Sequence, residues 1–295
     1  MTIKHLVLSG GGPTLFQTLG ALEHLQKENY IQSENIETIY GTSAGSIVGT
    51  LFCLKYEDFD MINDYVIKRP WKDVFSVKIQ HILDAYTKKG IFDRSFFEKT
   101  LKPLLKAKDL ALDIDLKDFY EYSKIEQHFF TFELNDFQLV DVSYKTHPDL
   151  KLIDALQMSC AIPVLISPVC FEQKCYIDGG VSCNYPWKQC MEQQKNGDEI
   201  LGFKNVLFEE NLEKTIINES STLLEFIMNF LFKAIFSLSA ENENNGQMTE
   251  KPKEVICHCS FLNIGLMKMA VDSMEERKSL FQKGVESAIE FLGRG

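Results

Sequence analysis

The chain has 295 residues, of which 45% are hydrophobic, and a formal net charge of -11. This composition excludes a disordered polar chain and favours a globular protein with a sizeable core. The acidic balance, without clustered lysine and arginine, excludes nucleic acid as a main partner and disfavours a strongly anionic membrane. Neutral or zwitterionic lipid stays open.

The cysteines and the first residues bear on the cellular compartment. Eight cysteines follow no spacing typical of a disulfide framework, so we expect reduced thiols. The first apolar run is too short for a signal peptide and leads straight into glycines. We therefore expect an intracellular, cytoplasmic protein whose contact with membranes is peripheral.

A glycine-rich turn follows the first predicted strand. Residues 6–8 form a short apolar strand, and a helix with regularly spaced leucines begins after Pro13. Between them stand three glycines: Gly10, Gly11 and Gly12. Successive glycines can turn their N–H groups into one concavity that suits a phosphate or an oxyanion. A dinucleotide fingerprint would need glycine at Leu15, and a P-loop would need Gly-Lys-Ser/Thr, so nucleotide binding is disfavoured.

Residues 36–55 carry the pattern on which the functional prediction depends. A β-branched and aromatic run, a Gly-x-Ser-x-Gly pentapeptide and an apolar helical stretch give the order strand, sharp turn, helix of a nucleophile elbow. Ser43 would stand at the tip of the turn, with Gly41 and Gly45 where any Cβ would clash. The helix directs its N–H groups and positive dipole end at the serine. An ordinary tight turn is the alternative, because the pentapeptide alone is common.

The middle of the chain predicts helices followed by a hairpin. Residues 56–125 have helical spacing, with breaks at Arg69-Pro70 and Lys89-Gly90, and they carry no catalytic pattern. Residues 128–142 alternate in polarity and predict a hairpin that turns at Asn135-Asp136.

An aspartate ends a later predicted strand. A helix over 152–158 leads into Ser159-Cys160-Ala161-Ile162-Pro163, and a strand over 175–177 runs into Asp178-Gly179-Gly180. Aspartate before two glycines commonly forms a turn. The end of a strand is also where an α/β sheet presents catalytic groups, so both interpretations stay open.

The last third predicts strands within 198–208 and over 255–261, and a helix over 274–292. Residues 222–240 are almost continuously apolar, with polar residues four apart, which predicts a buried or capping helix or one that touches a lipid surface. The charge of Lys233 argues against a membrane span. The polar stretch 240–254 predicts a flexible loop.

Four motifs together resemble the patatin-like phospholipase family, in their order and in their predicted settings. They are Ser9-Gly10-Gly11-Gly12, Gly41-Thr42-Ser43-Ala44-Gly45, Ser159-Cys160-Ala161-Ile162-Pro163 and Asp178-Gly179-Gly180. The ordered set is specific although each motif alone is not. The likeness extends to a closing helix with Gly284 and Ala288, and it is weakest at 56–125 and 209–254.

The resemblance implies an α/β fold, a three-layer sandwich with a central, mostly parallel sheet, as a single domain over 1–295 with its core motifs in 5–200. Ser43 would be the nucleophile and Asp178 the base of a dyad without histidine, with glycines 10–12 as the oxyanion loop. Gly179 and Gly180 would form the turn after the base. Neither a metal nor an organic cofactor is implied. The implied function is a lipid acyl hydrolase of phospholipase A or lysophospholipase type, with triacylglycerol or acyl thioester as alternative substrates.

Two features keep alternatives open. Pro13-Thr14-Leu15 stand where the family usually has a variable residue, Arg or Lys, and Gly, which favours reduced activity or a non-catalytic lipid-binding protein. Ser43, Asp178 and His258 follow the order of an α/β-hydrolase triad, although we expect His258 to be a core residue of a buried strand. Cys257 and Cys259 flank it, but alternate strand residues face opposite ways and no second ligand pair follows, so zinc is not expected.

Overall fold

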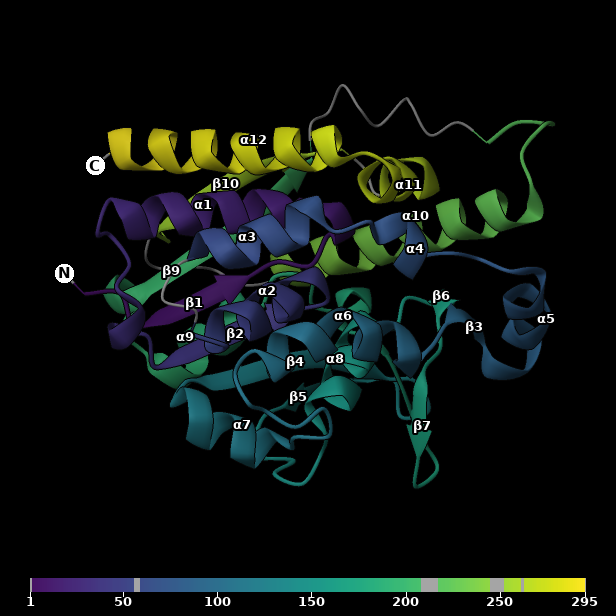
Figure 1. Ribbon diagram of the computed structural model, residues 1–295, viewed down its shortest axis with the longest axis horizontal. Coiled ribbons are helices and arrows are strands. Elements are labelled where there is room, and N and C mark those ends of the chain that lie inside the picture. Colours follow the sequence, from purple (N-terminus) through teal and green to yellow (C-terminus); the bar gives the residue numbers. More distant parts are fainter. Residues whose placement is uncertain (1, 56–58, 208–216, 245–251, 261–262, 295) are drawn as a thin grey trace.

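An eight-stranded mixed sheet forms the centre of the part of the chain that the structure describes (Figure 1). The structure is a computed structural model, and it describes residues 2–55, 59–207, 217–244, 252–260 and 263–294. The strands of this sheet are β1 (His5–Leu8), β2 (Thr38–Thr42), β4 (Glu126–Glu133), β5 (Gln138–Val142), β7 (Val169–Phe171), β8 (Lys174–Asp178), β9 (Ile200–Leu207) and β10 (Glu254–Cys259). Their order is β10-β9-β1-β2-β4-β8-β7, with β5 paired to β4 off this path.

The strands from β10 to β4 run parallel, whereas β5 and β8 are antiparallel to β4, and β7 is antiparallel to β8. The predicted α/β fold with a central, mostly parallel sheet is therefore confirmed. A smaller parallel pair, β3 (Gly90–Phe92) with β6 (Val164–Ile166), was not predicted. Each of these strands has three residues and pairs with a segment far away in sequence, so neither carries a local periodic signal.

Helices cover both faces of the sheet. The α-helices of the described residues are α1 (Leu15–Lys27), α2 (Ala44–Cys53), α3 (Phe59–Lys68), α4 (Trp71–Val74), α5 (Ile79–Lys88), α6 (Arg94–Lys106), α7 (Leu116–Ser123), α8 (Leu152–Cys160), α9 (Trp187–Gln194), α10 (Leu223–Asn244), α11 (Ile264–Asp272) and α12 (Met274–Gly293). Alternate strand residues point to opposite faces, so Leu6 and Leu8 of β1 enter the large apolar core with α1 and α2. Val7 enters a second core with Trp187 of α9. Helices α1 and α2 on one face, the sheet itself, and α9 on the other face thus form three layers.

The register of three strands brings the two predicted reactive residues to the same level. Thr42 of β2 lies opposite Phe130 of β4, and Asp178 of β8 lies opposite the next residue of β4, Thr131. Ser43, which follows Thr42, is therefore level with Asp178 across β4. β8 runs antiparallel to β4 and so enters the sheet from the edge at which β2 ends. Its last residue stays near that edge because β8 stops opposite Thr131.

Helices α1 and α12 pack through glycines. A Cβ added to Gly20 of α1 would overlap the carbonyl oxygen of Phe281, and one added to Gly284 of α12 would overlap the carbonyl oxygen of Gln17. The two backbones therefore approach more closely than any other residue type would allow, and α12 is fixed against the helix that follows the glycine turn.

Gly284→Ala is expected to lower the free energy of unfolding by about 3 kcal/mol, because the added methyl group must push the two backbones apart. Gly293→Ala in the same helix is the control, since nothing lies within 4 Å of the Cβ it would add. Urea denaturation of both variants measures the difference. Equal stability of the two would contradict the close packing of α1 on α12.

Helix α10 extends further than predicted. It ends at Asn244, so residues 240–244 are helical rather than part of a loop, because the apolar helix continues through a polar final turn. The remainder of the predicted loop, up to residue 251, lies outside the described residues. Met228 and Phe232 on one face of α10 are buried, whereas Leu223 is 75% exposed, so the helix caps the core and faces solvent at once. No helix in the described ranges combines the length and the hydrophobicity needed to cross a bilayer.

The cysteines differ from the prediction at one pair. Cys170 and Cys175 lie opposite each other on β7 and β8 and are joined by a disulfide, so the expectation of eight free thiols is wrong. The tight turn between these two antiparallel strands brings the pair together, and no spacing rule for disulfide frameworks describes such a local bridge. The other six cysteines lie outside this disulfide, and five of them are buried.

Candidate active site

Ser43 lies at a strained turn between β2 and α2. Its backbone angles are φ 52° and ψ -119°, and it is 8% exposed. Such angles cost energy for any residue with a Cβ and are maintained only where the surroundings enforce them. A Cβ on Gly41 would lie 2.8 Å from the carbonyl carbon of Gly45, and a Cβ on Gly45 would overlap the carbonyl oxygen of Leu8. The structure thus has the elbow, and both glycines are needed for the reason that the sequence indicated.

Ser159 holds this turn from the neighbouring helix α8. Its Oγ accepts a hydrogen bond from the Ser43 N–H at 2.9 Å, lies 2.8 Å from Ser46 Oγ and donates to the Phe130 carbonyl oxygen at 2.8 Å. All three contacts are buried. One function of the Ser159-to-Pro163 motif is therefore to fix the strained backbone of Ser43 to β4.

The Asp178 carboxylate is buried beside Ser43. Its Oδ1 accepts a hydrogen bond from the Gly180 N–H at 2.7 Å, and its backbone N–H donates to the Ala161 carbonyl oxygen at 3.0 Å. Its Oδ2 is buried and has no hydrogen-bond partner among the described residues. The Ser43 hydroxyl lies close enough to the carboxylate to act on its pKa, and catalytic hydrogen bonds often shorten only when substrate binds.

Burial determines the protonation of this group. Removal from water raises the pKa of Asp178 to about 6, although the Ser43 hydroxyl and the Gly180 N–H act in the opposite direction. Burial also raises the pKa of the neighbouring Cys160 thiol well above its usual value, so this cysteine is neutral beside the carboxylate. Asp178 is therefore the group near Ser43 that changes charge close to neutral pH.

The glycine turn lies against the same serine. A Cβ on Gly10 would lie 3.3 Å from Ser43 Cβ. The Gly10 N–H is not available to a ligand, because it donates to the Asn184 carbonyl oxygen at 2.9 Å. Gly11 (φ 153°) and Gly12 (φ 56°) adopt conformations that L-residues rarely reach, and within the described residues neither of their N–H groups donates a hydrogen bond. The N–H groups of Gly11 and Gly12 thus have no hydrogen-bond acceptor among the described residues, in a turn whose Gly10 lies against Ser43.

Two asparagines hold this turn in shape. Asn205 Nδ2 donates to the Gly10 carbonyl oxygen and to Thr14 Oγ1, both at 2.8 Å, and Asn184 Nδ2 donates to the Gly10 carbonyl oxygen at 3.2 Å. Sequence reasoning missed both residues. Pro13 lies in a short 3-10 helix, Gly12–Thr14, directly before α1. Proline suits a first helical turn, where its missing N–H has no intrahelical acceptor.

The histidines lie away from Ser43. His258 is an exposed residue of β10, which is separated from β2 by β9 and β1, so both the expected core role and a triad with Ser43 are wrong. Val255 and Cys257 of the strand are buried, whereas the alternate residues Ile256 and His258, on the opposite face, are not. The described residues, which include its neighbours Cys257 and Cys259, hold no group of three or more His, Cys, Asp or Glu that could bind a metal ion.

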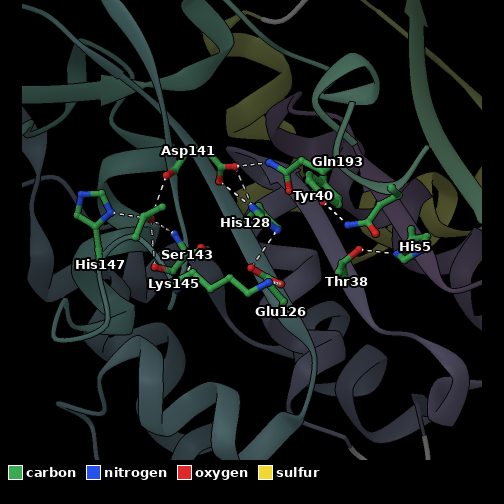
Figure 2. Close-up of polar contacts among 12 residues, drawn as sticks. His5, Thr38, Tyr40, Glu126, His128, Asp141, Ser143, Lys145, His147 and Gln193 are labelled. Carbon is green, nitrogen blue, oxygen red and sulfur yellow. Dashed lines mark hydrogen bonds and ion pairs between the residues drawn. The ribbon is translucent and has the colours of Figure 1, made fainter. Parts of the chain in front are cut away.

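Another histidine does form a pair with an aspartate, within the sheet. His128 Nδ1 lies 2.9 Å from both carboxylate oxygens of Asp141, and its ring stacks on Tyr40 with 4.2 Å between ring centroids (Figure 2). His128 also lies 3.5 Å from Glu126. Tyr40 precedes Ser43 by three residues, roughly 10 Å along an extended strand. This cluster links β2, β4 and β5 and is not the base for the serine.

Comparison with known proteins decides the family. The family model described as patatin-like phospholipase matches residues 6–191, well over half of the chain, and includes every motif residue described above. The chain belongs to the patatin-like phospholipase family. Members of this family are serine lipid acyl hydrolases. β9 and β10, which complete the sheet, follow the matched range.

Two viral proteins are similar to the chain. The chain is 26% identical over 185 residues to a probable lipid hydrolase of Invertebrate iridescent virus 6, a match covering 62% of this chain and 61% of that protein. The chain thus matches less than two thirds of that relative's length. It is 25% identical over 300 residues to an uncharacterized protein of Acanthamoeba polyphaga mimivirus, covering 97% of this chain and 92% of the relative.

One solved structure supports the fold. VipD from Legionella pneumophila is similar with a TM-score of 0.58 at 16% sequence identity, and the match covers 100% of this chain and 67% of VipD. At this level of identity the likeness concerns the fold alone. It extends the agreement beyond the range of the family model, to β9, β10 and α12.

Proposed function

We propose that this protein hydrolyses acyl esters of phospholipids or lysophospholipids through a dyad of Ser43 and Asp178. The observation that carries the proposal is the placement of the buried, unpartnered Asp178 Oδ2 beside a strained serine. A buried carboxylate oxygen without a hydrogen-bond partner is costly, and such costs are typical of functional sites. Membership of a family of lipid hydrolases and the name of the iridescent virus relative support the same class of substrate.

The chemistry follows from the contacts. Ser43 Oγ attacks the ester carbonyl carbon while its proton passes to Asp178 Oδ2. Negative charge then develops on the carbonyl oxygen, and the N–H groups of Gly11 and Gly12 would stabilise it, each contributing about 3 kcal/mol. The protonated Asp178 gives the proton to the departing alcohol, which leaves an acyl-serine. Water, deprotonated by the same carboxylate, releases the fatty acid and restores Ser43.

The raised pKa of Asp178 suits this cycle. A carboxylate with an ordinary pKa near 4 is a weak base, and a pKa of about 6 brings its basicity nearer to the operating pH. The same group is then acidic enough to return the proton to the leaving alcohol. Because the dyad needs no third member, the positions of the histidines are compatible with the proposal.

A fluorophosphonate probe tests the nucleophile directly. We expect the folded protein to be labelled at Ser43, located by peptide mass spectrometry, and the heat-unfolded protein and the Ser43→Ala variant to remain unlabelled, because the serine is activated only in the folded site. Lipid products released from phosphatidylcholine vesicles by wild type and Ser43→Ala identify the substrate. Cleavage of triacylglycerol or acyl thioester alone would change the substrate class. Absence of labelling together with vesicle binding would instead indicate a non-catalytic lipid-binding protein.

A further inference from the structure

Helix α5 presents its apolar side chains to solvent. They form a stripe along one face, with the exposed fractions Ile79 80%, Ile82 59%, Leu83 63% and Tyr86 95%. The residues between them, His81 and Asp84, are less exposed. A surface helix of a protein that remains in water normally has the opposite orientation, with its apolar stripe against the core. The α5 stripe therefore needs a cover that the described chain does not supply.

A second exposed apolar group lies at the same end of the molecule, where α5 and the start of α10 are seen together in Figure 1. Leu223, Phe226 and Phe230 of α10 are 75%, 55% and 66% exposed. The opposite face of α10 is buried, with Met228 and Phe232 packed in one cluster with Ile162 and Leu165. α10 therefore joins an exposed apolar face to the interior of the protein.

Basic residues flank the α5 stripe in the sequence. The segment 68–89 has two acidic residues and six basic ones, which are Lys68, Arg69, Lys72, Lys78, Lys88 and Lys89. Lys78 precedes α5 and Lys89 follows it, so a lysine stands at each end of the stripe, whereas Lys88 pairs with Asp93 at 2.9 Å. The whole chain carries -11. The net charge of the whole chain disfavours binding to an anionic membrane. At α5, however, Lys78 and Lys89 stand next to the exposed apolar side chains.

We propose that the α5 stripe docks on a lipid bilayer that contains anionic lipids, with Leu223, Phe226 and Phe230 as a second contact. A helix with an apolar face and basic ends lies in the plane of the interface, with lysines at the headgroups and apolar side chains among the acyl chains. Tyr86 has the amphipathic ring that such interfaces favour. This inference rests on the proposed function, because the docking would serve to bring lipid to Ser43.

The docking surface is continuous with the candidate active site. α5 leads directly into β3, whose Ile91 packs in the same cluster as Ile162, Leu165 and α10. Ile162 follows the Ser159-to-Ala161 segment that contacts both Ser43 and Asp178. α10 also packs against the turn Gly179–Val181 that follows Asp178. A bilayer in contact with both helices would therefore lie next to the elements that form the dyad.

Vesicle flotation with two matched variants tests this proposal. Ile82→Glu/Leu83→Glu places two carboxylates on the stripe, and Met274→Glu/Ile289→Glu places two on exposed positions of α12, so net charge is equal in both. With vesicles of phosphatidylcholine mixed with phosphatidylserine, we expect the α5 variant to bind at least tenfold more weakly than wild type and the α12 variant to bind within twofold of it. Lys72→Gln/Lys78→Gln should weaken binding to these vesicles and leave binding to pure phosphatidylcholine unchanged.

Turnover separates docking from chemistry. A short p-nitrophenyl ester is soluble and needs no surface, so the α5 variant should hydrolyse it like wild type while losing hydrolysis of vesicle phospholipid. Ser43→Ala should bind vesicles normally; hydrolysis of the soluble ester by this variant would contradict the proposed function alone. Equal vesicle binding by the α5 variant and wild type would overturn the docking proposal. Self-association that the α5 substitutions abolish, without vesicle binding by wild type, would also overturn it and would indicate a second copy as the cover.

Discussion

Asp178→Asn is expected to lower kcat for ester hydrolysis by about 10²- to 10⁴-fold, the range typical of losing a general base. Asparagine keeps the shape and an oxygen that can accept the Gly180 N–H, so the turn after β8 should persist. It cannot take the proton from Ser43. Steady-state kinetics on a soluble ester measure the loss. Full activity in this variant would contradict the dyad.

The pH dependence gives a second measurement on the same residue. The base acts only when ionised, so kcat/KM of the wild type should rise with pH through about 6 and then level off. The residual activity of Asp178→Asn should lack this step. A wild-type profile without a change near pH 6 would show that another group takes the proton.

As pH rises through about 6, the stability of the folded protein should fall while its activity rises. The folded-state pKa of Asp178 is raised above the unfolded value, so the native state binds this proton more tightly and loses stability as pH rises from about 4 through about 6. Above that window the buried charge costs about 3 kcal/mol. Asp178→Asn removes it, so the Tm of the variant should exceed that of wild type by several degrees at pH 8 and approach it near pH 4. Differential scanning calorimetry at both pH values measures the difference.

The parts of the site that were predictable are those with local causes. Gly41 and Gly45 are required by atoms of the same turn or of the adjacent strand, and the strand-turn-helix order around Ser43 is written in consecutive residues. The strand before Asp178 was found for the same reason. What the sequence alone could not give is the register that makes Ser43 and Asp178 level, because it depends on how β2 and β8 each pair with β4.

The residues that were missed act over long separations. Asn184 and Asn205 hold the Gly10 carbonyl oxygen from positions more than 170 residues away in sequence, and an asparagine after a turn or within a strand carries no sign of such a role. His258 was misplaced because an alternating strand pattern does not reveal that β10 is an edge strand. Helical spacing in α5 was likewise visible, but periodicity does not say whether the apolar face points inward.

The oxyanion loop is tested by Gly11→Ala. A Cβ at this position would overlap Thr14 Oγ1 and lie 2.6 Å from Asn205 Nδ2, in a backbone conformation (φ 153°) that alanine rarely adopts. The loop must therefore move, and the N–H groups of Gly11 and Gly12 would leave the carbonyl oxygen. We expect kcat to fall by about 10²- to 10³-fold, the effect typical of losing an oxyanion donor. Because the loop stabilises charge that develops only during the reaction, KM should change little.

Two comparisons show whether this loss comes from the oxyanion. Asp178 is untouched by Gly11→Ala, so the rise of kcat/KM through about pH 6 should remain, at a lower plateau. Gly293→Ala, which adds a methyl group in open space, should retain wild-type activity. If Gly11→Ala were fully active, the carbonyl oxygen would have to be held elsewhere, and the N-terminal N–H groups of α2 would be the next donors to test. If instead kcat/KM of Gly11→Ala no longer rose through about pH 6, the glycine loop would act on Asp178 rather than on the substrate.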